Sequence, residues 1–256
     1  MISITVIGNG NVAFHLINRF LAEQKQPSSK LTLQQVWARD LSKFKNQSLP
    51  IVRNMEDLQP TDVTILAVSD RAISEVSKLL SFENQLVVHT SGSTSFSAIA
   101  EKHKRGVFYP LQTFSKTKEI NFEHIPILIE TENENDFQIL NELAKIISKN
   151  VQKLNGLQRQ NLHIAAVFAC NFTNHLYALS AEICKNHDID FQLLFPLIEE
   201  TTQKIKNMSA KEAQTGPAKR NDLITLEKHI SLLDKPFQKE IYQLLTQSIQ
   251  AYEKEL

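Results

Sequence analysis

The sequence is poor in cysteine, and its charges cancel. It has two cysteines, Cys170 and Cys184, both in one helical region, and neither lies in a metal or redox spacing. We expect reduced, buried thiols there. Lysine plus arginine and aspartate plus glutamate number 28 each, so the chain offers no basic field for nucleic acid and no acidic tail.

Long hydrophobic runs and targeting patterns are also missing. No apolar run approaches the roughly 18 residues that a membrane span requires. The chain enters a strand at its second residue without the charged-apolar-small pattern of a targeting segment. We therefore expect a cytoplasmic protein that binds neither membrane nor nucleic acid. Its 256 residues suffice for one large or two modest domains.

Glycine is scarce as well, with six in the whole chain. Each falls at a predicted junction between elements, which indicates that glycine is kept for special backbone conformations. The six are Gly8, Gly10, Gly92, Gly106, Gly156 and Gly216.

The most informative motif is a Gly-x-Gly-x-x-Ala turn between a strand and a helix. The alternating strand 2–7 leads into Gly8, and an amphipathic helix follows. The first glycine permits a tight turn, the second lets a diphosphate approach the backbone, and a small third residue lets helix and strand pack closely. A plain strand-turn-helix is the alternative. In the dinucleotide interpretation the cofactor is bound by Gly8, Asn9, Gly10, Asn11, Val12 and Ala13.

The end of the second predicted strand, 32–38, bears on the choice of cofactor. Arg39 comes first after this strand, and its planar guanidinium suits the 2′-phosphate of NADP. Asp40 follows and could instead accept hydrogen bonds from the ribose of NAD. The order of the two residues favours NADP, with NAD as the alternative.

The chain changes character near residue 155. Up to there, strands and helices alternate in the pattern of a doubly wound, mostly parallel α/β sheet covered on both faces. From Gly156 onward the spacing is helical throughout. We predict a nucleotide-binding domain over residues 1–155 and an all-α substrate and dimerisation domain over residues 156–256.

Ligands of such a sheet bind beyond the carboxyl ends of its strands, where three polar segments lie, 69–71, 89–93 and 109–113. We expect cofactor contacts from Val68, Ser69, Asp70 and Ser91, and substrate contacts from Ser91, Gly92, Ser93 and Gln112. A serine turn that caps the next helix, and an N-cap role for Asp70, are the structural alternatives.

The helix that starts near Gln158 is strongly apolar between His163 and Cys170, so we expect it to be buried. His163, Asn171 and Asn174 are spaced to share one face of a continuous α-helix. His163 is the candidate acid of a hydride-transfer reaction, Asn171 holds the substrate oxygen and Asn174 contacts the substrate. An internal hydrogen-bond network is the alternative. A metal is not expected, because His163 and His175 lie roughly 18 Å apart along the helix.

A loop between helices, 215–222, holds Arg220, whose guanidinium suits a substrate carboxylate or a carboxylate in a partner subunit. A structural turn between helices, with Asp222 starting the next helix, is the alternative.

These segments together resemble a bacterial family of Rossmann-like oxidoreductases with a C-terminal helical domain. The family is related to ketopantoate reductase, pyrroline-5-carboxylate reductase and 3-hydroxyisobutyrate dehydrogenase. The matching segments are 8–13, 67–70, 89–93, 109–114, 163–171 and 215–229. The resemblance implies an NADP-linked reductase with a helical domain like that of 6-phosphogluconate dehydrogenase, through which relatives often form homodimers.

The resemblance leaves the substrate open. Ketopantoate is the leading expectation, and reduction of a cyclic imine, as in pyrroline-5-carboxylate reductase, is a second. Better-known members carry a catalytic lysine on the first long helix, followed four residues later by asparagine. Here His163 and Val167 stand in that region. The missing lysine also admits a nucleotide sensor or scaffold without catalysis.

Overall fold

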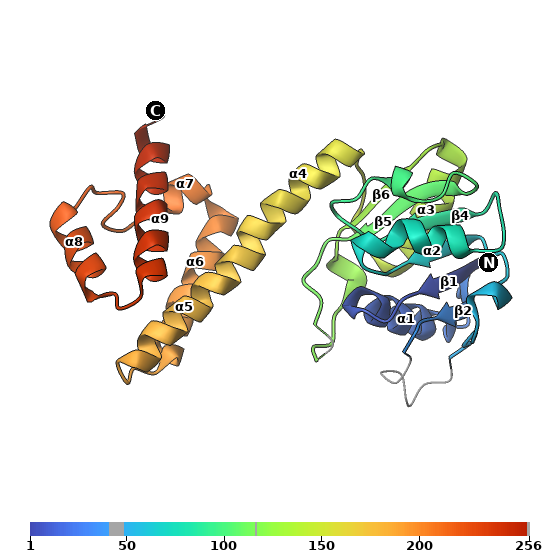
Figure 1. Ribbon diagram of the computed structural model, residues 1–256, viewed down its shortest axis with the longest axis horizontal. Helices are drawn as coiled ribbons and strands as arrows, with labels where there is room; N and C mark the ends of the chain where they lie inside the picture. Colours follow the sequence, from blue (N-terminus) through green and yellow to red (C-terminus); the bar gives the residue numbers. More distant parts are fainter. Residues whose placement is uncertain (41–48, 116, 255–256) are drawn as a thin grey trace. The chain divides into compact units, whose positions relative to one another are not determined.

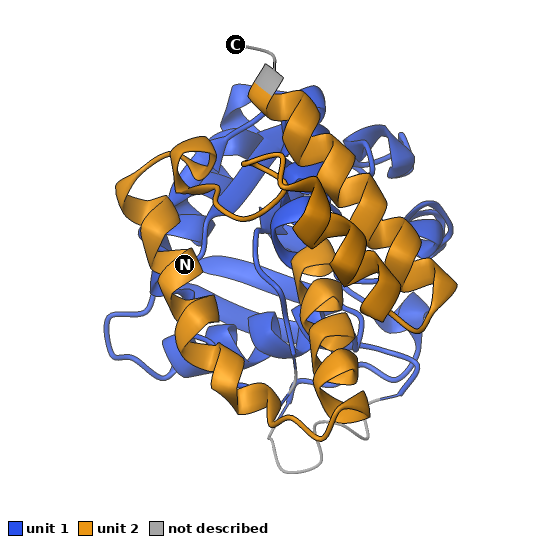
Figure 2. Ribbon diagram, turned by 90° about the vertical axis from the view of Figure 1, so that its left-hand side faces the viewer, with its two compact units in different colours: residues 1–170 blue, residues 171–256 orange. Residues whose placement is uncertain are grey.

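The computed structural model describes residues 1–40, 49–115 and 117–254. The chain divides into two compact units, residues 1–170 and 171–256, coloured separately in Figure 2. The change from alternating strands and helices to continuous helix falls at Gly156, as the sequence pattern predicts. The assignment of separate tasks to residues 1–155 and 156–256 stays a prediction.

The first unit is built on a seven-stranded sheet of order β2-β1-β3-β4-β5-β6-β7 (Figure 1). Every neighbouring pair is parallel except β5 and β6, so the expected doubly wound, mostly parallel architecture is confirmed. The strands are β1 (Ile2–Ile7), β2 (Leu31–Trp37), β3 (Val63–Leu66), β4 (Leu86–His89), β5 (Lys104–Pro110), β6 (Ile127–Thr131) and β7 (Val151–Lys153).

Helices cover both faces of this sheet. Neighbouring strand residues point to opposite faces, so Val6 and Ile65 pack with α1 and α3, whereas Ile7 and Leu66 pack with α2. Each fully buried side chain of this size contributes about 1.5–3 kcal/mol. The helices are α1 (Asn11–Gln24), α2 (Ile73–Leu79), α3 (Glu134–Ile147) and α4 (Gly156–Ala166), with the 3-10 turns η2 (Met55–Asp57), η3 (Asp70–Ala72), η4 (Phe96–Ala98) and η5 (Phe122–His124).

A capping box fixes the start of α4. The Asn155 side chain accepts a hydrogen bond from the Gln158 N–H (2.9 Å), and the Gln158 side chain accepts one from the Asn155 N–H (3.0 Å). The first turns of α4 belong to the first unit. This cap therefore determines where Arg159 and His163 lie against the sheet.

The second unit is helical. A π-helical segment, η6 (Val167–Phe172), leads into it from α4. It contains α5 (Thr173–Asn186), the 3-10 turn η7 (Phe191–Leu194), α6 (Phe195–Asn207), α7 (Ala210–Ala213), α8 (Leu223–Leu232) and α9 (Pro236–Lys254). Among the helices of the described ranges, none has both the length and the apolar character needed to cross a membrane.

Three local predictions are wrong. The sequence pattern over residues 95–102 predicts a helix, but only η4 forms there, because the Ser95 hydroxyl accepts from the Ser97 N–H and competes with helical bonding. The apolar residues 51–52 predict a strand, but Ile51 makes only a single bridge to Val36. Cys170 is exposed and only Cys184 is buried.

Candidate active site

The turn after β1 is shaped by its first glycine. Gly8 has φ +135°, a conformation that L side chains rarely adopt, and a Cβ there would lie 2.2 Å from the carbonyl oxygen of Ala67. The turn therefore passes directly against the end of β3. At Gly10 a Cβ would meet only the same oxygen, at 4.0 Å, so the backbone there is open to a ligand.

The start of α1 has the features that favour binding of an anion. Gly10 is the N-cap and supplies no side-chain acceptor, and no acidic residue lies in the first turn. The first N–H groups of the helix therefore lack a cap, and a helix N-terminus attracts negative charge. Ala13 is fully buried, which meets the need for a small residue under the turn.

These features open into a pocket of about 580 Å³ at the carboxyl ends of β1, β2 and β3. It collects most of the residues expected to bind the cofactor and several that the sequence did not single out. Its lining is Gly8, Asn9, Gly10, Asn11, Val12, Trp37, Ala38, Arg39, Ala67, Val68, Ser69, Ala72, Val76 and Thr90. The open turn, the uncapped helix and this volume suit the diphosphate and one nucleoside of a dinucleotide.

Arg39 and Asp40 at the end of β2 are both exposed, and only Arg39 lines the pocket. The Asn9 side chain donates to the backbone carbonyl of Asp40 (2.8 Å) and so ties the glycine turn to the end of β2. Within the described residues, Arg39 makes no ion pair. Its guanidinium therefore lines the pocket without a carboxylate partner, and its role toward a 2′-phosphate stays a prediction.

The turn after β4 lies beside this pocket. The Ser91 hydroxyl accepts from the N–H groups of Ser93 (3.2 Å) and Thr94 (3.0 Å), which is the structural alternative considered for this segment. The Ser93 hydroxyl donates to Asp70 (2.8 Å) and so connects the ends of β3 and β4. Thr90 lines the pocket, and Gly92 is only two residues further along this turn.

Arg159, on α4, is the residue that sequence reasoning missed. Its side chain is 1% exposed and forms an ion pair with Glu130 at 3.0 Å. One terminal nitrogen also donates to the carbonyls of Ser91 (3.1 Å) and Gly92 (2.9 Å). This guanidinium therefore holds the turn after β4 in place. The available signal was a pair of opposite charges in apolar surroundings, Arg159 near the start of an apolar helix and Glu130 near the end of an apolar strand.

His163 lies one helical turn beyond Arg159 and meets Tyr109. The Tyr109 hydroxyl is 3.1 Å from Nδ1 of His163, and the planes of the two rings make an angle of 69°. A Cβ at Gly92 would lie 2.6 Å from Nδ1 of His163 and 2.8 Å from Cζ of Tyr109, so any side chain there would displace one of the two rings. Burial raises the pKa of Tyr109, and Arg159 opposes that rise.

His89, at the end of β4, is fully buried beside this turn. Its Nδ1 accepts from the Ser91 N–H (3.2 Å), and its Nε2 has no hydrogen-bond partner among the described residues. Burial lowers the pKa of His89 to about 4, and the charge of Arg159 acts in the same direction. The imidazole is therefore neutral at physiological pH.

This histidine predicts an acid-sensitive fold. The unfolded chain protonates near pH 6.5 and the folded chain near pH 4, so stability falls as pH drops through that window, by about 3 kcal/mol in total. His89→Asn keeps an acceptor for Ser91 but does not titrate. Urea unfolding at pH 7 and pH 4 should show that this variant loses about 3 kcal/mol less than the wild type. The exposed His124→Asn serves as control, and equal losses in all three proteins would contradict the assignment.

Four residues predicted to bind substrate or to act in catalysis have none of these contacts. Gln112 is exposed, and its side chain accepts from the Thr113 N–H. Asn171, Asn174 and Arg220 belong to the second unit, where all three are exposed. Their part in the site stays a prediction.

The expected buried helix needs correction. Ile164 and Phe168 are 55% and 65% exposed, so the apolar stretch after His163 is not buried as predicted. The π segment η6 interrupts the spacing by threes and fours on which a shared face of His163, Asn171 and Asn174 was predicted. The prediction rests on the repeat of a regular α-helix, about 3.6 residues per turn, and that repeat does not reveal a π segment.

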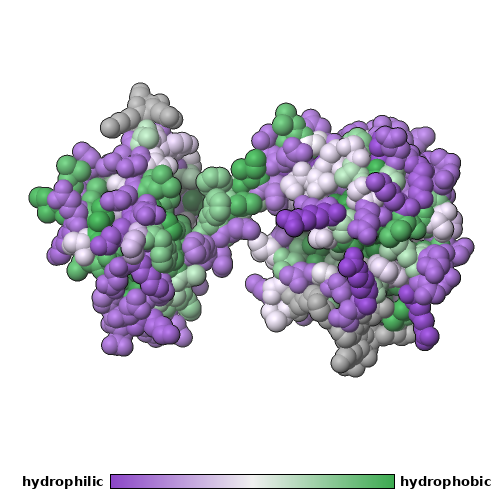
Figure 3. Space-filling model, in the orientation of Figure 1, coloured by the Kyte–Doolittle hydropathy of each residue, from purple (hydrophilic) through white to green (hydrophobic). Residues whose placement is uncertain are grey.

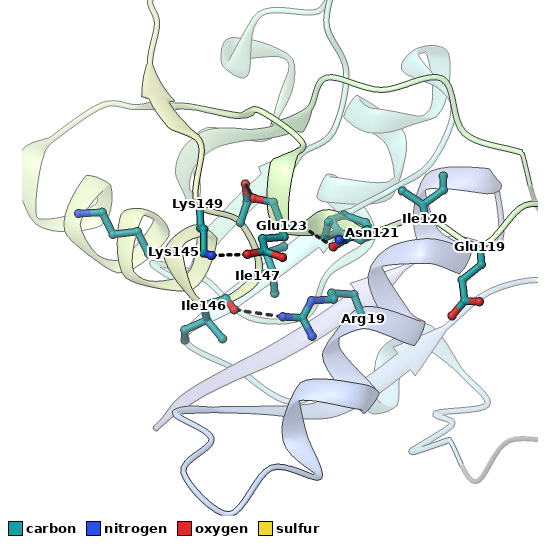
Figure 4. Close-up of a pocket in the computed structure, with 11 residues that line it drawn as sticks. Arg19, Glu119, Ile120, Asn121, Glu123, Lys145, Ile146, Ile147 and Lys149 are labelled. Atoms are coloured by element: carbon teal, nitrogen blue, oxygen red, sulfur yellow. Dashed lines mark hydrogen bonds and ion pairs between the residues drawn. The ribbon is translucent and has the colours of Figure 1, made fainter.

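A larger cavity, of about 720 Å³, lies between α1, residues 119–123 and the end of α3 (Figure 4). Two of the three cations in its lining, Arg19 and Lys149 but not Lys145, pair with other groups of the described residues. Arg19 pairs with Glu23 and donates to the Ile146 carbonyl, while Lys149 pairs with Glu123. This cavity has neither a glycine turn nor a helix N-terminus, so it is a weaker candidate for the cofactor than the smaller pocket.

The chain is similar to one family model and to several solved structures. A model for a domain of unknown function, DUF2520, matches residues 125–249. A Bacteroides fragilis protein, BF3122, whose name gives it as a candidate NADP oxidoreductase, is 34% identical over 98% of both chains, with a TM-score of 0.86. No curated protein matches the sequence.

Two more distant structures share the fold. A reductive aminase from Aspergillus terreus, solved with NADPH and ethyl levulinate, is 15% identical over 100% of this chain and 94% of its own, with a TM-score of 0.64. An imine reductase from Myxococcus stipitatus, solved with NADP⁺, is 15% identical over 99% of this chain and 93% of its own, with a TM-score of 0.61.

Proposed function

Because this chain belongs to the family of Rossmann-type oxidoreductases with a C-terminal helical domain, we propose that it is an NADP-dependent reductase of a small oxo acid or of an imine. The observation that carries the proposal is the pocket at the glycine turn before α1. Beside it lies the turn after β4, whose Gly92 lies against Tyr109 and His163. The pocket holds the nucleotide, and the pair serves the chemistry.

The bound nicotinamide supplies a hydride, and the chain must supply a proton and polarise the bond that is reduced. His163 holds the proton in this proposal, and Asn171 holds the substrate oxygen. The remaining substrate contacts are assigned to Ser91, Gly92, Ser93, Gln112, Asn174 and Arg220.

Two substrate classes compete. An oxo acid such as ketopantoate needs a cation for its carboxylate, and Arg220 is the residue assigned to it. An iminium ion instead suits the carboxylate of Asp70, which Ser93 holds beside the turn, while the buried Arg159 is already paired with Glu130. The reductive aminase and imine reductase of similar fold are the reason to test imines in parallel.

The test begins with calorimetric titration of NADPH and NADH. Ketopantoate and a cyclic imine such as 1-pyrroline are then added while absorbance of the reduced nicotinamide is followed. NADPH binding with oxidation by either compound supports the proposal and chooses the class. Binding without turnover favours a nucleotide sensor, and no binding of either nucleotide overturns the proposal.

Arg39→Ala tests the choice of nucleotide. Loss of a charge-assisted bond to the 2′-phosphate should weaken NADPH binding about 10- to 100-fold while NADH binding is unchanged. The exposed Arg53, outside the pocket lining, gives the matched control Arg53→Ala. Equal losses for both nucleotides would show that Arg39 does not read the phosphate, and a wild type that prefers NADH would point to Asp40.

We also assign homodimerisation to the helical domain. Of the described residues after 170, only Cys184, Ala218 and Leu226 are buried apolar side chains. Large apolar side chains instead lie on its surface, where Figure 3 shows them in green; Leu193, Leu197, Ile224 and Leu244 are 63–83% exposed. Such a surface is typical of an interface. Light scattering at several concentrations tests this, and a monomer throughout would contradict it.

A further inference from the structure

We propose that Tyr109 delivers the proton to the substrate and that His163 acts behind it as a relay. This inference rests on the proposed reductase function and assigns the proton donor within it. The sequence places Tyr109 in the polar segment 109–113 but assigns it no role. Its role follows from where β5 ends and from what its hydroxyl contacts.

The sheet register places Tyr109 at the reactive edge. His89 of β4 lies opposite Val107 of the parallel strand β5, so Tyr109 is level with Ser91, at the turn beside the nucleotide pocket. Phe108 packs in the core under α1 and α3. Since side chains alternate along a strand, Tyr109 points to the other face of the sheet.

The hydrogen bond determines the order of the two groups. Nδ1 of His163 is occupied by the Tyr109 hydroxyl at 3.1 Å. His163 is half-buried, and its Nε2 makes no hydrogen bond within the described residues, which leaves that edge of the ring for water. Tyr109 therefore stands as the donor, and His163 connects it to solvent.

Burial keeps the phenol of Tyr109 protonated. The pKa of Tyr109 is raised from its usual value near 10, mainly by burial, so the phenol is protonated throughout the physiological range. Gly92 keeps the pair free of competing side chains, because even a Cβ there would overlap both rings. The phenol is thus a fixed acid in a narrow site.

The proton balance closes with hydride from a reduced nicotinamide nucleotide. As the carbonyl carbon accepts hydride, the O–H bond of Tyr109 breaks and the substrate oxygen takes the proton. The phenolate then takes the proton on Nδ1 of His163 while Nε2 takes one from solvent water, so the ring stays neutral and hydroxide leaves to the bulk. The substrate gains one hydride and one proton in all.

Tyr109→Phe should lower the rate of carbonyl reduction about 10²- to 10⁴-fold, because that is the usual contribution of a general acid. The dissociation constant of NADPH should not change. An N-methyl-1-pyrrolinium salt is already cationic and needs no proton, so its reduction should stay near the wild-type rate. A merely structural role would lower both rates together.

Tyr242→Phe is a matched control, because Tyr242 also contacts a histidine, with its hydroxyl 2.8 Å from Nδ1 of His229 in the helical unit. This variant should reduce ketopantoate at the wild-type rate. His163→Ala should lose less carbonyl activity than Tyr109→Phe, since water can still recharge the phenol. In an absorbance titration of ligand-free protein, Tyr109→Phe should lack one tyrosine ionisation that the wild type shows at high pH.

The outcomes separate the two proposals. Full carbonyl activity in Tyr109→Phe with loss in His163→Ala would mean that His163 donates directly, which overturns this inference and keeps the reductase. Equal loss of carbonyl and iminium reduction in Tyr109→Phe also overturns it, as does a wild type that reduces the iminium alone. A wild type that reduces none of the probes overturns the proposed function itself.

Discussion

Gly8→Ala is expected to abolish measurable NADPH binding and to destabilise the first unit by at least about 2 kcal/mol, the range for a residue forced into a rare backbone region. The new Cβ would lie 2.2 Å from the Ala67 carbonyl oxygen, and φ at this position is +135°. The turn and the end of β3 must then separate, which distorts the pocket. Calorimetry with NADPH and urea unfolding measure the two effects.

Two other glycines separate the causes. Gly216→Ala introduces a side chain at φ +105° where a Cβ meets no atom within 4 Å, so it reports backbone strain alone and should leave NADPH binding intact. Gly10→Ala has room against the protein but protrudes where the diphosphate should lie. It should lose binding and keep stability. A Gly8→Ala protein that binds NADPH normally would refute the pocket.

Arg159→Met should destabilise the first unit by about 3–5 kcal/mol, the usual cost of leaving a buried charge without its partner. Glu130, 13% exposed, would lose its cation, and the carbonyls of Ser91 and Gly92 would lose their donor. Hydrogen exchange of peptides from β4 to β6 reads this loss locally, because protection there reports the opening free energy of that region.

Arg105→Met provides the comparison. Arg105 pairs with Glu132 in the same sheet, but the two side chains are 19% and 32% exposed, so its loss should cost about 1 kcal/mol or less. If Arg159→Met costs no more than Arg105→Met, the buried guanidinium does not organise the turn. Arg159→Met should also slow turnover, since Gly92 and the Tyr109–His163 pair depend on that turn.

Local chemistry explains why the first half of the site could be predicted from the sequence. Gly8 and Gly10 act through backbone conformation, which depends on their immediate neighbours, and the helix they start is amphipathic in its own right. The alternation of strands and helices predicts the parallel sheet, and the sheet in turn places residues 68–70 and 90–92 at one edge.

The second half depends on contacts between distant segments. Arg159 and Glu130 are 29 positions apart, and nothing local to either residue shows that they pair. Tyr109 and His163 meet only because β5 and α4 converge on Gly92. Ser91 lies in the turn beside the pocket, and its hydroxyl is used by that turn, a choice that the sequence left open.

The lining of the nucleotide pocket contains Trp37, and this is the only tryptophan in the chain. The protein therefore carries one indole fluorophore, at the end of β2 where the nucleotide is proposed to bind. Tryptophan emission overlaps the absorption of reduced nicotinamide, so energy transfer would report occupancy without a label. The helical unit contains no tryptophan, so a change in tryptophan emission reports on the surroundings of Trp37.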